Sequence, residues 1–165
     1  PSQKSALFYA RADNLNNWLG DVATRLGSLS QRLSASVGRV KLNSSLKTES
    51  VLPGQVPKVD EEIVETPWLQ IDDVFYEARG QAWALSHLLR AIEVDFADVL
   101  AKKNATVSVR QIIRELEASQ APVWSPMILN GSGFGVLANH SLVMANYISR
   151  ANAAVIDLRQ LLSQG

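Results

Sequence analysis

Residues 15–40 read LNNWLGDVATRLGSLSQRLSASVGRV, and their apolar side chains recur in steps of three and four. That spacing places them on one face of an α-helix, which completes a turn every 3.6 residues. The pattern continues through Gly20, Gly27 and Gly38, although a glycine costs a helix up to about 1 kcal/mol relative to alanine. We therefore expect one long helix from about Ser5 to Val40, with any kinks at the glycines. Its apolar positions are Leu15, Trp18, Leu19, Val22, Leu26, Leu29, Leu33, Val37 and Val40.

Residues 41–65 differ in composition from this helix. Pro53-Gly54, Pro57 and the acidic run at 60–62 interrupt any helical period. We interpret the segment as a loop or connector, with room for a short helix at about 40–50.

Thr66-Pro67 then gives a helix start signal, with Thr as N-cap and Pro at the first helical position. The second helix is expected to extend to about Ala101. Its apolar stripe comprises Val74, Ala78, Ala82, Leu85, Leu89, Ile92, Phe96 and Val99.

Two further helices follow. Ser108 and Gln111 form a capping-box pattern, which predicts a short third helix. Its inward residues are expected to be Val109, Ile112, Ile113 and Leu116. A last helix is expected from about Gly135 to Leu162. The sequence thus predicts an all-α fold, an elongated bundle of about four helices, two of them long, in one domain over residues 1–165.

Thirty-two consecutive residues, Ala118 to Ser149, contain no Lys, Arg, Asp or Glu in a chain where 19% of residues are charged. Prolines, glycines and asparagines interrupt the tract, so it is no membrane span of about 20 apolar residues. It must be packed inside, pressed on a partner, or lining a pocket. We expect it to fold inward as a seam between helices, with few groups left for another molecule. Trp68 and Trp124 are the tryptophans expected to be partly exposed.

The overall composition excludes several classes of function. Sixteen basic and sixteen acidic residues cancel, so there is no electrostatic case for nucleic-acid binding. The chain has no cysteine, which rules out disulfides, thiolate metal sites and cysteine nucleophiles.

A glycine-rich loop precedes the last helix at Asn130-Gly131-Ser132-Gly133-Phe134-Gly135. Backbone N–H groups at a helix start attract anions, and glycine lets a ligand approach the backbone. A phosphate, carboxylate or peptide-terminus site is therefore one interpretation. The candidate binding residues are Trp124, Asn130, Ser132, Gly133, Phe134, Asn139 and His140.

The alternative is a tight structural turn whose glycines meet a steric need, with Ser132 or Asn130 as the helix cap. Ser132 does not match the Gly-x-Ser-x-Gly pattern of hydrolases, because position 130 is Asn. We predict no catalytic residue, so an enzyme is the less favoured class.

Asp73, Glu77 and His87 share one face of the second helix and are weak candidates for metal ligands. The helical di-metal proteins use Glu-x-x-His, which is absent here. We favour a solvated polar face and predict no metal and no cofactor.

Two groups of residues carry a family resemblance. The run from Val123-Trp124-Ser125-Pro126 through 130–135 to 138–144, together with residues 75–80 and 83–85, resembles the bacterial family of unknown function DUF2333. The resemblance implies a helical domain anchored in a bacterial inner membrane by a segment outside this chain, with the domain itself in the periplasm. It implies no activity and no catalytic residue.

Our leading hypothesis is a non-enzymatic interaction module. Its charge-free loop, with Trp124 and Phe134, is then either the contact surface for a protein partner or a structural plug. The long amphipathic helices also favour self-association. The alternative hypothesis is a small-ligand or anion-binding domain, or an enzyme, that uses Asn130, Ser132, Asn139 and His140.

Overall fold

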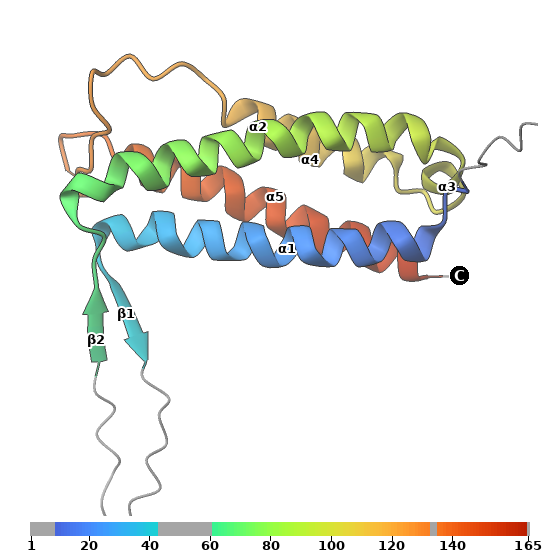
Figure 1. Cartoon of the computed structure of the whole chain (residues 1–165), viewed down its shortest axis with the longest axis horizontal. Coiled ribbons are helices and arrows are strands. Elements are labelled where there is room, and N and C mark those ends of the chain that lie inside the picture. Colours follow the sequence, from blue (N-terminus) through green and yellow to red (C-terminus); the bar gives the residue numbers. More distant parts are fainter. Residues whose placement is uncertain (1–8, 43–60, 133–134, 165) are drawn as a thin grey trace, which may run out of the picture.

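The computed structural model describes residues 9–42, 61–132 and 135–164. Three long helices and one shorter helix form an elongated bundle, which confirms the predicted all-α fold (Figure 1). The helices are α1 (Ala12–Ser34), α2 (Ile71–Asp95), α3 (Ala97–Lys102), α4 (Thr106–Ala118) and α5 (His140–Ser163). α5 packs on α1 and on α4, and α4 packs on α2, so the seam between α1 and α2 is the least closed side of the bundle.

The antiparallel pair α1 and α5 forms the most extensive contact of the core. Ser30 of α1 donates a hydrogen bond to the carbonyl of Ala145 at 3.5 Å, and Asn16 accepts one from Arg159 at 3.1 Å near the opposite end. Every predicted apolar position of α1 from Leu15 to Leu33 is buried except Trp18, which is half-buried. The buried residues of α5 are Ser141, Met144, Ala145, Ile148, Ala151, Val155, Leu158 and Leu162.

Gly20 and Gly27 lie inside α1 without ending it. A Cβ added at Gly20 would lie 3.2 Å from a guanidinium nitrogen of Arg159, and one at Gly27 would lie 3.6 Å from the amide nitrogen of Asn152. The absence of a side chain at these two glycines therefore leaves room for Arg159 and Asn152 of α5. The helix α1 has no break at either position.

The first helix is shorter than predicted, because α1 ends at Ser34 and a 3₁₀ turn (Ala35–Val37) follows. Gly38 then adopts a φ of 85°. Residues other than glycine rarely adopt that conformation, so the chain leaves the helix there. The expectation of a helix to Val40 is wrong.

A short hairpin follows the turn. β1 (Arg39–Leu42) pairs antiparallel with β2 (Glu61–Val64), with Arg39 opposite Val64. The hairpin extends away from the bundle (Figure 1). The short helix predicted at about 40–50 is wrong at residues 40–42, which lie in β1, and its other residues are outside the described part of the chain.

The second predicted helix also has different ends in the structure. Thr66 does not cap it, since a 3₁₀ turn (Trp68–Gln70) leads into α2 without a side-chain cap. The helix stops at Asp95, where Phe96 has non-helical angles, and α3 covers the rest of the predicted segment.

The four inward residues predicted for the third helix are all buried. The capping box is wrong, because α4 begins at Thr106 and Ser108 lies within the helix. Asn104, with a φ of 52°, makes the turn from α3 to α4 instead. The last helix begins at His140, five residues later than predicted. Within the described ranges, no helix combines the length and the apolar content needed to cross a membrane.

We predict that Leu158→Ala lowers the free energy of unfolding by about 2–5 kcal/mol, because the leucine is fully buried and its loss leaves a cavity. The matched control is Leu69→Ala, whose leucine is 81% exposed and should cost no more than about 0.5 kcal/mol. Urea denaturation of both variants measures the difference. Equal losses would contradict the assignment of α5 to the core.

Candidate functional site

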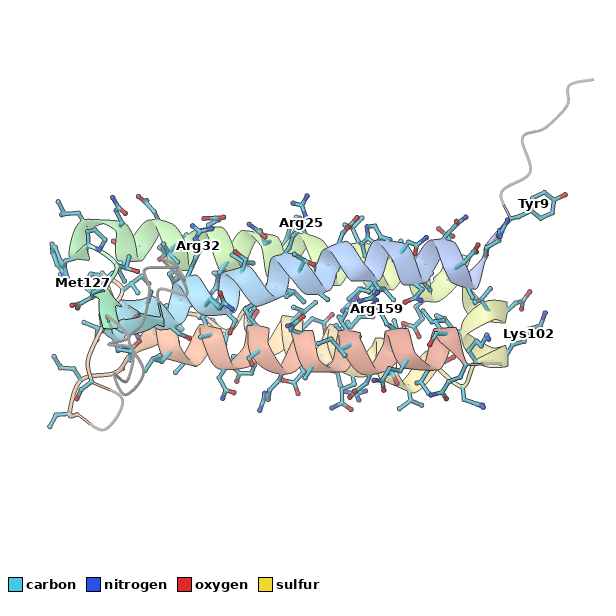
Figure 2. All side chains as sticks on the ribbon, turned by 90° about the horizontal axis from the view of Figure 1, so that it is seen from below. Tyr9, Arg25, Arg32, Lys102, Met127 and Arg159 are labelled. Carbon is cyan, nitrogen blue, oxygen red and sulfur yellow. The ribbon has the colours of Figure 1, made fainter. Side chains whose placement is uncertain are left out.

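The charge-free tract forms the loop of residues 119–139 and the first half of α5. The loop lies at the end of the bundle where α2 and α5 begin (Figure 1). Met127, half-exposed, is at this end, opposite Lys102 (Figure 2). The tract was expected to fold inward, and this is wrong for most of the loop. Trp124 is 94% exposed and Val136 is fully exposed, whereas Ser119, Ile128 and Asn139 are the buried residues among those of the loop that the structure describes.

The side chain of Asn139 joins the loop to α5. Its Oδ1 accepts a hydrogen bond from the backbone N–H of Leu142 at 2.8 Å, which makes Asn139 the N-cap of the helix. Its Nδ2 donates to Oδ1 of Asn130 at 3.0 Å and to the carbonyl of Gly131 at 2.6 Å. The cap is therefore Asn139, and neither Ser132 nor Asn130 as the alternative interpretation had it.

Backbone contacts close the same loop. Asn130 and Asn139 form an antiparallel bridge, and the N–H of Gly131 donates to the carbonyl of Ala138 at 3.0 Å. A Cβ at Gly131 would clash with the carbonyl oxygen of Leu137, so this glycine meets a steric need. The amide of Asn130 also donates to the carbonyl of Ser36, which ties the loop to the 3₁₀ turn that follows α1.

His140 has a fixed ring orientation. Its Nδ1 accepts a hydrogen bond from the N–H of Leu129 at 2.9 Å, while its own backbone N–H donates to the carbonyl of Leu129 at 3.0 Å. An accepting Nδ1 carries no proton, so Nε2 is the ring nitrogen that holds one. The ring packs against Phe75 of α2, with centroids 6.4 Å apart.

Arg79 anchors the beginning of the loop. Its guanidinium donates to the carbonyls of Gln120 at 2.6 Å and Ala121 at 2.9 Å, and the amide of Gln120 donates back to the carbonyl of Arg79 at 3.2 Å. A cation at the C-terminal end of α4 is also favoured by the helix dipole. The loop is thus held at both ends and at its buried Ile128.

A cavity of about 220 Å³ lies between α2, the start of the loop and α5. Its lining is mostly apolar, and Arg79 is the charged residue in it. A second hollow adjoins the first at Val143, which lines both. The first is lined by Phe75, Arg79, Ala118, Ser119, Ala121, Pro122, Val123, Trp124, His140, Val143, Met144 and Tyr147.

We define the apolar loop face as Trp124, Val136, Leu137 and Val143. All four are exposed, and they border these two adjoining hollows. Trp68 and Leu69 are exposed at the same end of the bundle, just before α2. Trp68 and Trp124 were expected to be partly exposed, and both are exposed. The exposure of Val136 and Leu137 was not predicted, because the absence of charge around them was the only signal.

The comparisons with known proteins identify one family. The sequence model of DUF2333, described as an uncharacterised protein conserved in bacteria, matches residues 1–165. The chain belongs to DUF2333. No curated protein and no solved structure gives a match. The resemblance found in the sequence is thereby confirmed.

The predicted binding residues of this DUF2333 chain do not all meet at one place. Asn130 and Asn139 bond to each other, His140 follows them and lines the first cavity, and Ser132 is exposed beside the second hollow. Trp124 lines the same cavity as His140. Gly133 and Phe134 lie outside the described residues.

The three metal candidates lie along α2, and two of them contact other groups. Both carboxylate oxygens of Glu77 accept hydrogen bonds from the guanidinium of Arg32, one of them at 2.8 Å. Nδ1 of His87 lies 2.8 Å from the carbonyl of Trp83, and its ring lies against that of Trp83. Asp73 is exposed. Among the described residues, no group of three or more His, Cys, Asp or Glu could hold a metal ion.

We predict that Asn139→Ala lowers the free energy of unfolding by about 2 kcal/mol, because it removes the cap and leaves the oxygens of Asn130 and Gly131 without their donor. Asn139→Ser retains a capping oxygen and should lose about half as much. Urea denaturation measures both. If Asn139→Ser and Asn139→Ala lowered the free energy of unfolding equally, the capping hydrogen bond would contribute nothing to stability.

The Arg32–Glu77 pair predicts a dependence of stability on pH. Hydrogen bonds from the Arg32 guanidinium lower the pKa of Glu77 from its ordinary value of 4.5. The pair's stabilisation is therefore complete above pH 4.5 and is lost as the pH falls through the lower folded value. Because both side chains are substantially exposed, Glu77→Gln should cost no more than about 1 kcal/mol at neutral pH. The free energies of unfolding of the native protein and of Glu77→Gln should converge as the pH falls into the acidic range. A difference that stays constant with pH would contradict the role of the Arg32–Glu77 pair.

Proposed function

We propose that this DUF2333 domain is a protein-interaction module and that the apolar loop face is its contact surface. The observation that carries the proposal is Trp124, which is 94% exposed on a loop with no charged residue. Covering about 200 Å² of tryptophan surface is worth roughly 5 kcal/mol before the costs of association. Tryptophan is also among the residues that dominate binding energy at protein interfaces.

The anchoring of the loop supports the same proposal. Hydrogen bonds from Arg79 hold its beginning, and those of Asn139 hold its end. A loop that is ordered before binding loses less conformational entropy when a partner docks. The side chains of Arg79 and Asn139 therefore position the loop, and the exposed Trp124 is available for contact.

The size of the first cavity favours a protein partner over a small ligand. Drug-sized ligands occupy pockets of about 300–1,000 Å³. The cavity beside Trp124 has about 220 Å³, which suits one apolar side chain from a partner. The backbone N–H groups of Gly131, Gly135 and His140 all donate within the loop, so they are not available to an anion.

The charges at this end of the bundle indicate which charge the partner should carry. Glu65, Asp72 and Asp73 are exposed near Trp68, at the start of α2. They would be repelled by anionic lipid headgroups and attracted to basic side chains. The proposed partner is a protein with an apolar projection and a basic rim.

An anchor in a bacterial inner membrane, by a segment outside this chain, is the second part of the proposal, with the domain in the periplasm. Its support is the family resemblance of the sequence. Fractionation of cells that express the full-length protein, with protease added to spheroplasts, tests it. Release of the protein with the soluble fraction would contradict the anchor.

Site-specific photo-crosslinking in cells tests the contact surface. A photoreactive phenylalanine at position 124 should give discrete covalent adducts with a protein. The matched control is position 94, because Val94 is 75% exposed near the end of α2, at the other end of the bundle. Val136→Ser with Leu137→Ser should weaken the adducts at 124. No adduct at 124, or the same adducts at 94, would contradict the proposal.

A further inference from the structure

A groove runs along the seam between α1 and α2, at a distance from the apolar loop face. Its volume is about 550 Å³, and its floor is formed by Val22, Leu26 and Leu85, which are buried. Trp18 is half-buried at its edge, and Leu88 is 53% exposed. The full lining is Trp18, Asp21, Val22, Arg25, Leu26, Gln81, Ala84, Leu85 and Leu88.

No helix within the described part of the chain covers this groove. Figure 1 shows α1 and α2 side by side on one face of the bundle, with α5 behind the seam. Arg25 projects outward from this face, on the side away from α5 (Figure 2). The α1–α2 face, defined as the groove and its lining residues, is thus an apolar strip with charged groups beside it.

Two opposite charges lie in the lining without a partner in the described chain. Asp21 and Arg25 are exposed, are four residues apart on α1, and form no ion pair or side-chain hydrogen bond with another described residue. Arg32 and Arg90, which are also exposed, have acidic partners. The face therefore carries one acid and one base for a second molecule.

The order of these charges makes the face complementary to itself. Two copies of α1 that meet antiparallel, related by a two-fold axis near residue 23, bring Asp21 of each copy opposite Arg25 of the other. The groove lining on α1 extends from Trp18 to Leu26, so its centre is close to that axis. The lining on α2 extends from Gln81 to Leu88, where an antiparallel crossing would bring the small residue Ala84 near its own copy.

The helices that carry the face are long enough for a dimer. Helices of 23 and 25 residues are about 35 Å long, and two of them side by side are about 20 Å wide, so stacking that continues beyond the α1–α2 face along both helices covers roughly 700 Å² per copy. A standard interface buries about 800 Å² per partner.

We propose that the chain forms an antiparallel homodimer in which the α1–α2 face of one copy stacks on that of the other. Trp18 and Leu88 supply the apolar contact, and two reciprocal ion pairs between Asp21 and Arg25 fix the register. This inference does not depend on the proposed function, because the groove shares no lining residue with the apolar loop face.

Charge reversal tests the dimer by sedimentation velocity over a range of concentrations. The native chain should dimerise. Asp21→Arg and Arg25→Asp should each weaken the dimer by about tenfold or more, since each variant opposes like charges at two places. The double variant should recover the native association. An equimolar mixture of the two single variants should form a heterodimer, because the two bases of one chain then face the two acids of the other.

Asp157→Arg on α5 is the matched control, since this carboxylate is exposed away from the face and should not affect association. Circular dichroism should show that every variant folds, because Asp21 and Arg25 have no partner within the described chain to lose. A chain that stays monomeric at every concentration would overturn the proposal. So would single reversals that leave the dimer intact, or a mixture that forms no heterodimer. Crosslinks from position 124 should be unchanged in the charge-reversal variants.

Discussion

The carboxamide of Asn139 is the group on which the placement of the loop depends. Its oxygen caps α5, and its nitrogen donates to Asn130 and to Gly131. Because α5 packs on both α1 and α4, a loop fixed to its first turn is fixed to the whole bundle. Together with the hydrogen bonds from Arg79 at the beginning of the loop, this contact holds the charge-free segment at the surface, where Trp124 is 94% exposed.

The apolar residues of the described chain lie in three parts of the bundle. The largest part is the core, in which the regular stripes of α1 and α5 bury each other. The second is the apolar loop face at one end, and the third is the groove along α1 and α2. The last two are exposed in the isolated chain, and their different positions allow two contacts to form at the same time. A dimer would then present two apolar loop faces to a partner assembly.

The helices could be predicted from the sequence wherever an apolar stripe continued over several turns. All four inward residues of α4 and the stripe of α1 through Leu33 are examples. The ends of the helices were harder to predict, because the sequence alone does not show which glycine ends a helix. Gly20 and Gly27 remain helical beside side chains of α5, whereas Gly38 has a positive φ and ends the segment. That difference comes from the tertiary structure, and no local sequence pattern predicts it.

The candidate site shows the same limit. The sequence placed Asn130, Asn139 and His140 among the functional candidates, but it could not show that the two amides bond to each other across the turn. The absence of charge in residues 118–149 indicated apolar surroundings without deciding between the interior and a partner. The exposure of Val136 and Leu137 follows from how tightly Gly131 and Asn139 close the loop.

Amide hydrogen exchange of the native chain tests the central claim most directly, namely that hydrogen bonds hold the exposed loop in one conformation. The N–H groups of Leu129, Gly131, His140 and Leu142 are all donors in the loop and at the helix start. They should exchange far more slowly than the unbonded amides of an unstructured peptide. Exchange of these four amides at the unprotected rate, while the core of α5 stays protected, would contradict the account.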